Sequence, residues 1–78
     1  MDIHAHEVMR MMLKLNRDFS RESLGEAIIE RFGEKARFHS CSAAGMDVNE
    51  VIDFLENRGK FVARADGFNT AQDKICDH

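Results

Sequence analysis

The chain has 78 residues, no proline, only two cysteines and no long run of apolar residues. Two cysteines are too few for a scaffold of several disulfides, and a reducing compartment would keep them as thiols. No apolar stretch approaches the ~18 residues that a membrane-spanning helix needs. Residues 1–20 also lack the basic start and apolar stretch of a secretory signal. We therefore expect one small cytoplasmic domain over residues 1–78 that does not enter a membrane.

The chain also has no excess of positive charge. It carries 11 Lys and Arg against 14 Asp and Glu, which gives a formal net charge of −3, and the basic residues are scattered among the acidic ones. Domains that bind nucleic acid usually concentrate basic side chains on one face. Nucleic acid is therefore not the expected partner of this chain.

Apolar spacing and capping residues predict three helices. Apolar residues recur at positions 8, 11, 12 and 15, the spacing of one helix face, which predicts a helix over about 5–15. Ser20 fits an N-cap and Gly33 a C-terminal stop, which together predict a second helix over about 21–32. Asp47 and Glu50 have the spacing of a capping box, which predicts a third helix that ends at Gly59.

Three short strands are expected between and after these helices. Alternation over residues 37–41 predicts a strand with Phe38 facing inward, and residues 60–64 and 68–70 predict a hairpin with a tight Asp66-Gly67 turn. Residues 71–78 are expected to form a tail that orders on binding a metal. The expected order is helix, helix, strand, helix, strand, strand. The expected fold class is α+β, a single domain with a three-stranded sheet that carries the helices on one side.

All four histidines and both cysteines fall into pairs in which a single residue separates the two members. The pairs are His4 and His6, His39 and Cys41, and Cys76 and His78. Imidazole and thiolate are the ligands that borderline-soft divalent metals prefer. The complete pairing therefore predicts a metal site. Two cysteines and two of the histidines would make a closed tetrahedral zinc site, and an additional histidine leaves iron, nickel or copper open.

The three pairs differ in how well they can chelate one ion. His39 and Cys41 point the same way if their segment is extended, so they form a credible chelate. Residues two apart on a helix are about 200° apart around its axis, so His4 and His6 can share an ion only where they precede the helix. The third pair lies in the expected tail, which can fold over an ion and be ordered by it. The site is built either within one chain or between two copies in a homodimer.

A thiol redox protein is the first alternative, with Cys41 and Cys76 cycling between dithiol and disulfide. The chain lacks the Cys-x-x-Cys spacing that usually tunes such pairs. Each histidine or cysteine taken alone also has a purely structural explanation, because cysteine is a common small core residue. The completeness of the pairing is what favours a metal site.

A winged-helix nucleic-acid-binding protein is the second alternative, since the hairpin over 60–70 resembles a wing. The acidic balance opposes it, and the segment from Gly33 to Met46 is too long for a simple helix-turn-helix. Glu7 beside His6 suggests a catalytic metal site, but Arg10 stands where a second helical ligand would be needed, so no enzyme is expected. The methionines at 9, 11 and 12 have helical spacing, which is more typical of core packing than of a copper site.

The chain resembles the YecH family of small bacterial proteins along essentially its whole length. The resemblance is carried by these segments: His4-x-His6-Glu7-Val8, Arg31-Phe32-Gly33, Arg37-Phe38-His39-Ser40-Cys41-Ser42, Gly59-Lys60-Phe61, Asp66-Gly67-Phe68 and Lys74-Ile75-Cys76-x-His78. It implies a metal-binding protein with no assigned reaction. It also implies that the functional residues are those of the three pairs, and it adds no substrate.

Overall fold

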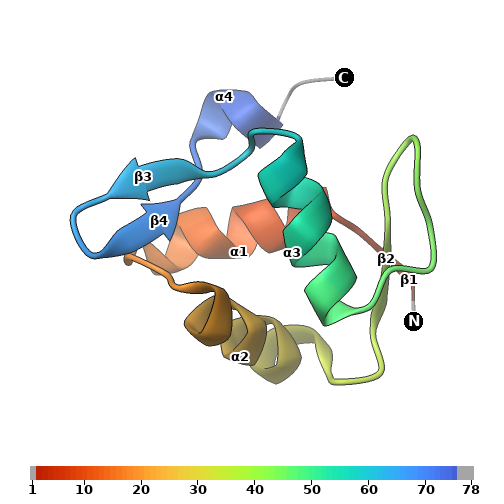
Figure 1. The fold of residues 1–78 in the computed structure, drawn as a ribbon. Helices are drawn as coiled ribbons and strands as arrows, with labels where there is room; N and C mark the ends of the chain where they lie inside the picture. The colour runs from red at the N-terminus through yellow and green to blue at the C-terminus, as the bar shows by residue number, and fades with distance from the viewer. Residues whose placement is uncertain (1, 76–78) are drawn as a thin grey trace.

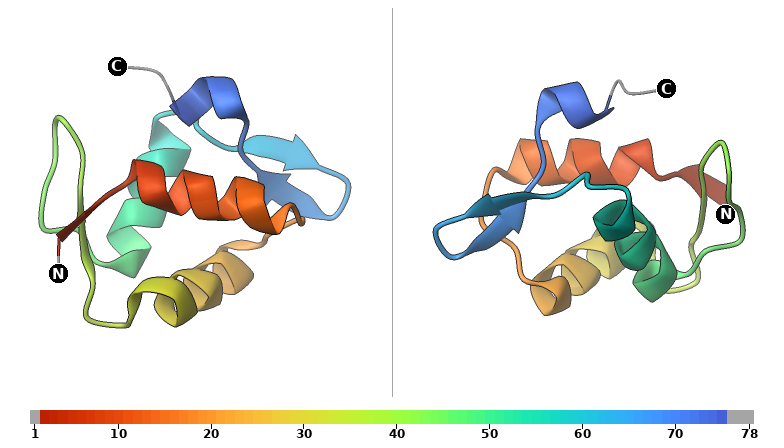
Figure 2. Two further views of the ribbon diagram at one scale, coloured as in Figure 1. Left: turned by 180° about the vertical axis from the view of Figure 1, so that it is seen from behind. Right: turned by 45° about the horizontal axis from the view of Figure 1, so that its top comes forward.

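A computed structural model of the chain describes residues 2–75. The elements are β1 (Asp2–His4), α1 (His6–Leu15), α2 (Arg21–Phe32), β2 (Arg37–His39), α3 (Val48–Asn57), β3 (Val62–Arg64), β4 (Gly67–Asn69) and α4 (Gln72–Ile75). Helices α1, α2 and α3 form the middle of the molecule. The pair β1–β2 and the hairpin β3–β4 lie on opposite sides of them (Figures 1 and 2).

The three predicted helices are confirmed, and the first turns of α2 and α3 are capped as expected. The Ser20 hydroxyl accepts a hydrogen bond from the Ser23 amide at 3.1 Å, at the start of α2. At the start of α3, the Glu50 amide donates to the Asp47 carboxylate at 2.8 Å, and the Asp47 amide donates to the Glu50 carboxylate at 2.9 Å. These bonds satisfy amides that have no partner within the helix, so the boundaries follow from local sequence.

The prediction of one three-stranded sheet is wrong, because the described residues form two separate two-stranded sheets. β1, which the sequence analysis does not predict, pairs in parallel with β2, and Ile3 lies opposite Phe38. β3 pairs with β4 alone, in antiparallel register. The structure also adds α4, so the order of elements differs from the expected one. The coarser prediction of a small α+β domain is confirmed.

The hairpin is shifted from its predicted position and attached to an unexpected partner. Val62–Arg64 and Gly67–Asn69 are its strands, so Gly67 begins β4 rather than completing the turn. The Phe19 amide donates to the Phe68 carbonyl at 2.8 Å, and the Phe68 amide donates to the Phe19 carbonyl at 2.9 Å. These bonds join the hairpin to the connection between α1 and α2.

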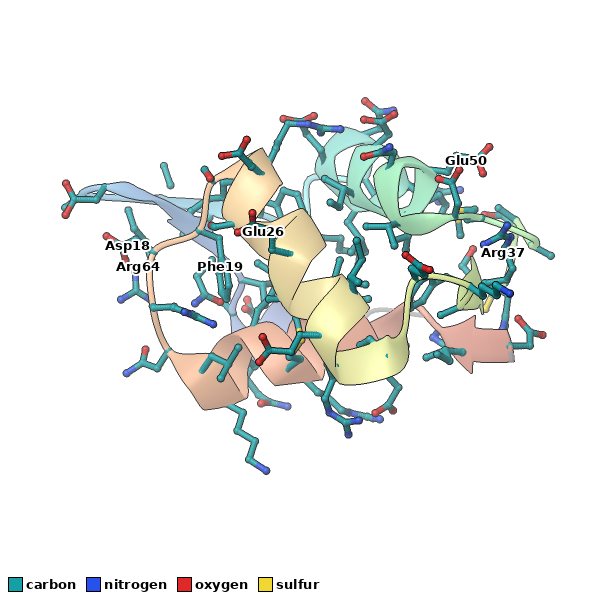
Figure 3. All side chains as sticks on the ribbon, turned by 90° about the horizontal axis from the view of Figure 1, so that it is seen from below. Asp18, Phe19, Glu26, Arg37, Glu50 and Arg64 are labelled. Atoms are coloured by element: carbon teal, nitrogen blue, oxygen red, sulfur yellow. The ribbon has the colours of Figure 1, made fainter. Side chains whose placement is uncertain are left out.

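An ion pair reinforces the same junction. Nε of Arg64 lies 2.7 Å from Oδ1 of Asp18, beside Phe19 (Figure 3). The second oxygen of Asp18 accepts the amide of Asp66 in the hairpin turn at 2.9 Å. One carboxylate therefore connects the segment before α2 to the end of β3 and to the hairpin turn.

The core lies between the helices and reaches both sheets. Its largest fully buried side chains are Phe19, Phe38, Met9, Met12, Leu24, Ile28, Ile52 and Leu55. The methionines of α1 thus pack in the core, as their spacing indicates. Ile75 of α4 is also buried, so the predicted tail over 71–78 begins with an anchored helical turn; its remaining residues, 76–78, lie outside the described part of the chain.

Candidate metal centre

Four of the six predicted ligands lie in the described part of the chain, in two neighbouring segments. His4 ends β1 and His6 opens α1, while His39 ends β2 and Cys41 lies in the turn that follows it. The other two, Cys76 and His78, lie outside the described residues. The parallel pairing of β1 with β2 brings together the first two pairs, which are about 35 positions apart in sequence.

The histidine rings cluster because of this pairing. His4 and His39 occupy matched positions of adjacent parallel strands, and their ring centroids are 5.0 Å apart in an edge-to-face arrangement. The rings of His4 and His6 are 4.0 Å apart. His4 precedes α1 but His6 is its first residue, so the pair does not lie wholly before the helix, and the junction of β1 with α1 is what brings the two rings together.

His39 has a carboxylate partner that the sequence analysis does not predict. Its Nδ1 lies 2.9 Å from Oδ1 of Asp2, at the other end of β1. The side chain of His39 is 35% exposed and that of Asp2 is 69% exposed. The sequence signal for Asp2 is its position two residues before His4, which places both on one face of an extended segment. That signal can be recognised only once residues 2–4 are known to form a strand.

His4 has a structural role at the start of α1. Its Nδ1 accepts the backbone amide of His6 at 3.0 Å. Ala5, at the N-cap position, has no side chain that could accept this bond, so the His4 ring satisfies one of the open amides of the helix. Nδ1 of His4 therefore already accepts a hydrogen bond, which limits how His4 can bind an ion.

The predicted alternation over 37–41 is wrong at its end, because β2 stops at His39. The Ser40 amide donates to the Ala43 carbonyl at 2.7 Å, and the Ser40 hydroxyl accepts the Ser42 amide at 3.1 Å. Serine side chains favour turns through such bonds to nearby amides. Cys41 is consequently a free, exposed cysteine in a turn rather than a strand residue on the face of His39.

Cys41 and the N-terminal histidines nevertheless line a common pocket of about 230 Å³. It is lined by His4, Ala5, His6, Met9, Ser40, Cys41, Ser42, Phe54, Leu55, Arg58 and Lys60. Arg58, which follows α3, donates to the Ser42 hydroxyl at 2.6 Å and thereby connects the turn that carries Cys41 to α3. The pocket is thus formed by the junction of β1 with α1, the turn after β2, and the end of α3.

The last described residues lie beside this pocket. Nζ of Lys60, a lining residue, donates to the Lys74 carbonyl at 3.0 Å. Ile75 follows Lys74 and is buried.

The described residues do not by themselves form a complete metal site. Among residues 2–75, no three His, Cys, Asp or Glu side chains are positioned together to hold an ion. A larger pocket of about 610 Å³ lies along α1 and α2, and none of the described residues that line it is a histidine or cysteine. Imidazole and thiol groups therefore lie at the smaller pocket, but residues 2–75 do not supply enough of them there to hold an ion.

Some of the surface charges in the described region form ion pairs with one another. Arg21 of α2 pairs with Asp53 at 2.5 Å and with Glu56 at 3.1 Å, both on α3, and Arg10 pairs with Glu7. None of the helices in this region is long and apolar enough to cross a membrane. These observations give no support to the winged-helix alternative, and Cys76, which the redox alternative needs, lies outside the described residues.

Comparison with known proteins identifies relatives along almost the whole chain. A family model described as "Protein of unknown function (DUF2492)" matches residues 1–77. The chain is 51% identical over 76 residues to the "Uncharacterized protein YecH" of Escherichia coli (strain K12), a match that covers 97% of this chain and 96% of that protein. No solved structure gives a significant match. Neither description names a ligand or a reaction.

Proposed function

This chain belongs to the DUF2492 family of uncharacterised, YecH-like proteins, and we propose that it is a non-enzymatic protein that binds a divalent transition metal, with zinc favoured. The observation that carries the proposal is the gathering of His4, His6 and Cys41 around one pocket, with His39 beside His4. These ligand types come from two segments that only the tertiary fold brings together.

The chemistry of the donors fits this group of metals. Zinc is commonly held by a combination of thiolate and imidazole, whereas magnesium and calcium prefer oxygen ligands. In the proposed site Cys41 and Cys76 anchor the ion as thiolates, and His39 and His78 complete the shell. His4 or His6 is a substitute or fifth ligand, and a site with more than two imidazoles also suits iron, nickel or copper.

The proposal needs ligands from residues 76–78, because the described residues supply an incomplete set. The bond between Lys60 and the Lys74 carbonyl supports this requirement, since it holds the chain beside the pocket two residues before Cys76. A metal bound there would tie the N-terminus, the turn after β2 and the C-terminus together. Its binding free energy would then add to the stability of the fold. The proposal locates the protein in the cytoplasm, where the thiolates stay reduced.

Native mass spectrometry tests the proposal on protein purified without added metal and on the same protein after zinc is supplied. We expect one metal ion per chain, or one per two chains if the site is shared in a homodimer. Cys41→Ser and Cys76→Ser should each weaken zinc binding, because a hydroxyl is a poor substitute for thiolate. Ala44→Ser is the matched control, since it places a serine at an exposed position of the same loop without removing a proposed ligand.

Two results would contradict the proposal. One is a wild-type protein that takes up no zinc, iron, nickel or copper and whose melting temperature is the same with chelator and with excess metal. The other is metal uptake that both cysteine variants retain at wild-type affinity, since the ion would then lie elsewhere.

A further inference from the structure

The parallel pair β1–β2 places one carboxylate and two imidazoles on a shared face. Asp2 and His4 are two apart on β1, and His39 lies opposite His4 on β2. The three side chains are therefore neighbours by register. The hydrogen bonds of the His39 ring differ from those of the His4 ring, and they determine which nitrogen of each ring has a lone pair for a metal ion.

The contact with Asp2 determines which ring nitrogen of His39 carries the proton. An ionised carboxylate can only accept a hydrogen bond, so at 2.9 Å from Oδ1 of Asp2 the Nδ1 of His39 must carry the proton. In the neutral ring the lone pair is then on Nε2. A histidine that donates one N–H to a carboxylate while its other nitrogen faces a metal is a common arrangement in metalloproteins, where the carboxylate fixes the ring and its tautomer.

His4 is held in the opposite state. Its Nδ1 accepts the His6 amide at 3.0 Å, so this nitrogen must have its lone pair and the neutral ring carries its proton on Nε2. Binding of an ion by the neutral His4 ring costs this bond by either route, because an ion on Nδ1 uses the accepting lone pair and an ion on Nε2 requires the proton to move to Nδ1. Either route would remove the bond by which the His4 ring caps the His6 amide at the start of α1.

We infer that Asp2 is a positioning residue that fixes His39 in the tautomer that binds through Nε2, so that His39 rather than His4 is the imidazole ligand of the β1–β2 pair. The inference rests on the proposed metal-binding function. An exposed pair of this kind adds little to folding stability, so the effect of Asp2 is on the orientation and protonation pattern of one ring. Asp2 itself does not contact the ion.

The first measurement concerns the metal-free protein and does not depend on metal binding. Nitrogen-15 NMR at a pH where the imidazoles are neutral reports which ring nitrogen carries the proton. Wild-type His39 should be protonated on Nδ1, and Asp2→Ala should move the proton toward Nε2. Asp2→Asn, which keeps an acceptor oxygen, should have a smaller effect, and Glu26→Ala, which removes an exposed carboxylate of α2, should have none. An unchanged His39 tautomer in Asp2→Ala would overturn the inference.

The second measurement is zinc affinity by competition with a chromophoric chelator. Loss of such an outer carboxylate typically weakens metal binding about 10- to 100-fold, and we expect a loss in this range for Asp2→Ala. In a His39→Ala background the additional Asp2→Ala change should have no further effect, because Asp2 acts through that ring. A further loss in that background would make Asp2 a direct ligand and overturn the positioning role.

The two measurements separate this inference from the proposed function. A wild-type protein that binds no metal while its His39 tautomer responds to Asp2→Ala refutes the proposed function and, with it, the role of Asp2 in a metal site. A wild-type protein that binds zinc, with Asp2→Ala binding equally well, refutes the inference alone. Thermal unfolding of each variant in chelator verifies that the fold is intact.

Discussion

Alanine at position 67 should weaken the junction between the hairpin and the segment before α2. A Cβ atom added to Gly67 would lie 2.2 Å from the carbonyl oxygen of Phe19 and 2.9 Å from its carbonyl carbon. Both are backbone atoms, so no side-chain rotation relieves the contact. The strand must move away from Phe19, and the two hydrogen bonds between Phe19 and Phe68 must lengthen or break.

The expected cost follows from those two bonds. Each contributes about 0.5–1.5 kcal/mol net, so losing both lowers the free energy of unfolding by about 1–3 kcal/mol. A chain of this length has a total stability of about 4–12 kcal/mol, so the variant should still fold. Each kcal/mol lowers the melting temperature by about 4–8 °C in a domain of this size.

Gly25 provides the matched control, with an effect of opposite sign. It lies inside α2, and an added Cβ would meet Cγ1 of Val48 at 3.8 Å and Cδ1 of Ile52 at 3.9 Å, which are ordinary contacts. Because glycine within a helix costs about 0.5–1 kcal/mol relative to alanine, Gly25→Ala should raise stability by about that amount. Thermal and urea unfolding followed by circular dichroism measure both variants. A Gly67→Ala protein as stable as wild type would refute the reasoning about the junction.

Three further results are expected. Asp47→Ala should lower the free energy of unfolding by about 1 kcal/mol in denaturant titrations, because it removes the cap of α3; an unchanged midpoint would show that this cap adds no stability. His4→Ala should cost about 0.5–1.5 kcal/mol in the presence of chelator, since the hydrogen bond from the His6 amide to the His4 ring is lost, and a variant that unfolds like wild type would contradict the capping role. Excess zinc should raise the melting temperature of the wild type more than that of Cys41→Ser, because a ligand stabilises the state that binds it; equal shifts would argue against Cys41 as a ligand.

The sequence identified candidate ligands of the site but not how they lie relative to one another. The histidine and cysteine pairs, the capping residues and the glycine stops are all local patterns, and the residue types alone support a hypothesis of metal binding. The spacing of His39 and Cys41 suggested a shared strand face, yet the hydrogen bonds of Ser40 end the strand between them. Asp2 was absent from the predicted site because its place beside His39 depends on β1, a strand that the sequence pattern does not predict.

Local sequence determined the helices, because a capping box or a helical apolar face involves residues only three or four positions apart. α2 and α3 therefore begin where Ser20 and Asp47 predict. Local sequence does not determine which strand a short strand pairs with. β1 has three residues, and its pairing with β2 depends on the burial of Ile3 and Phe38 in a common core. The tertiary structure alone decided that His39 lies beside His4, that Asp2 holds its ring, and that the hairpin joins Phe19, because each of these contacts spans more than thirty residues.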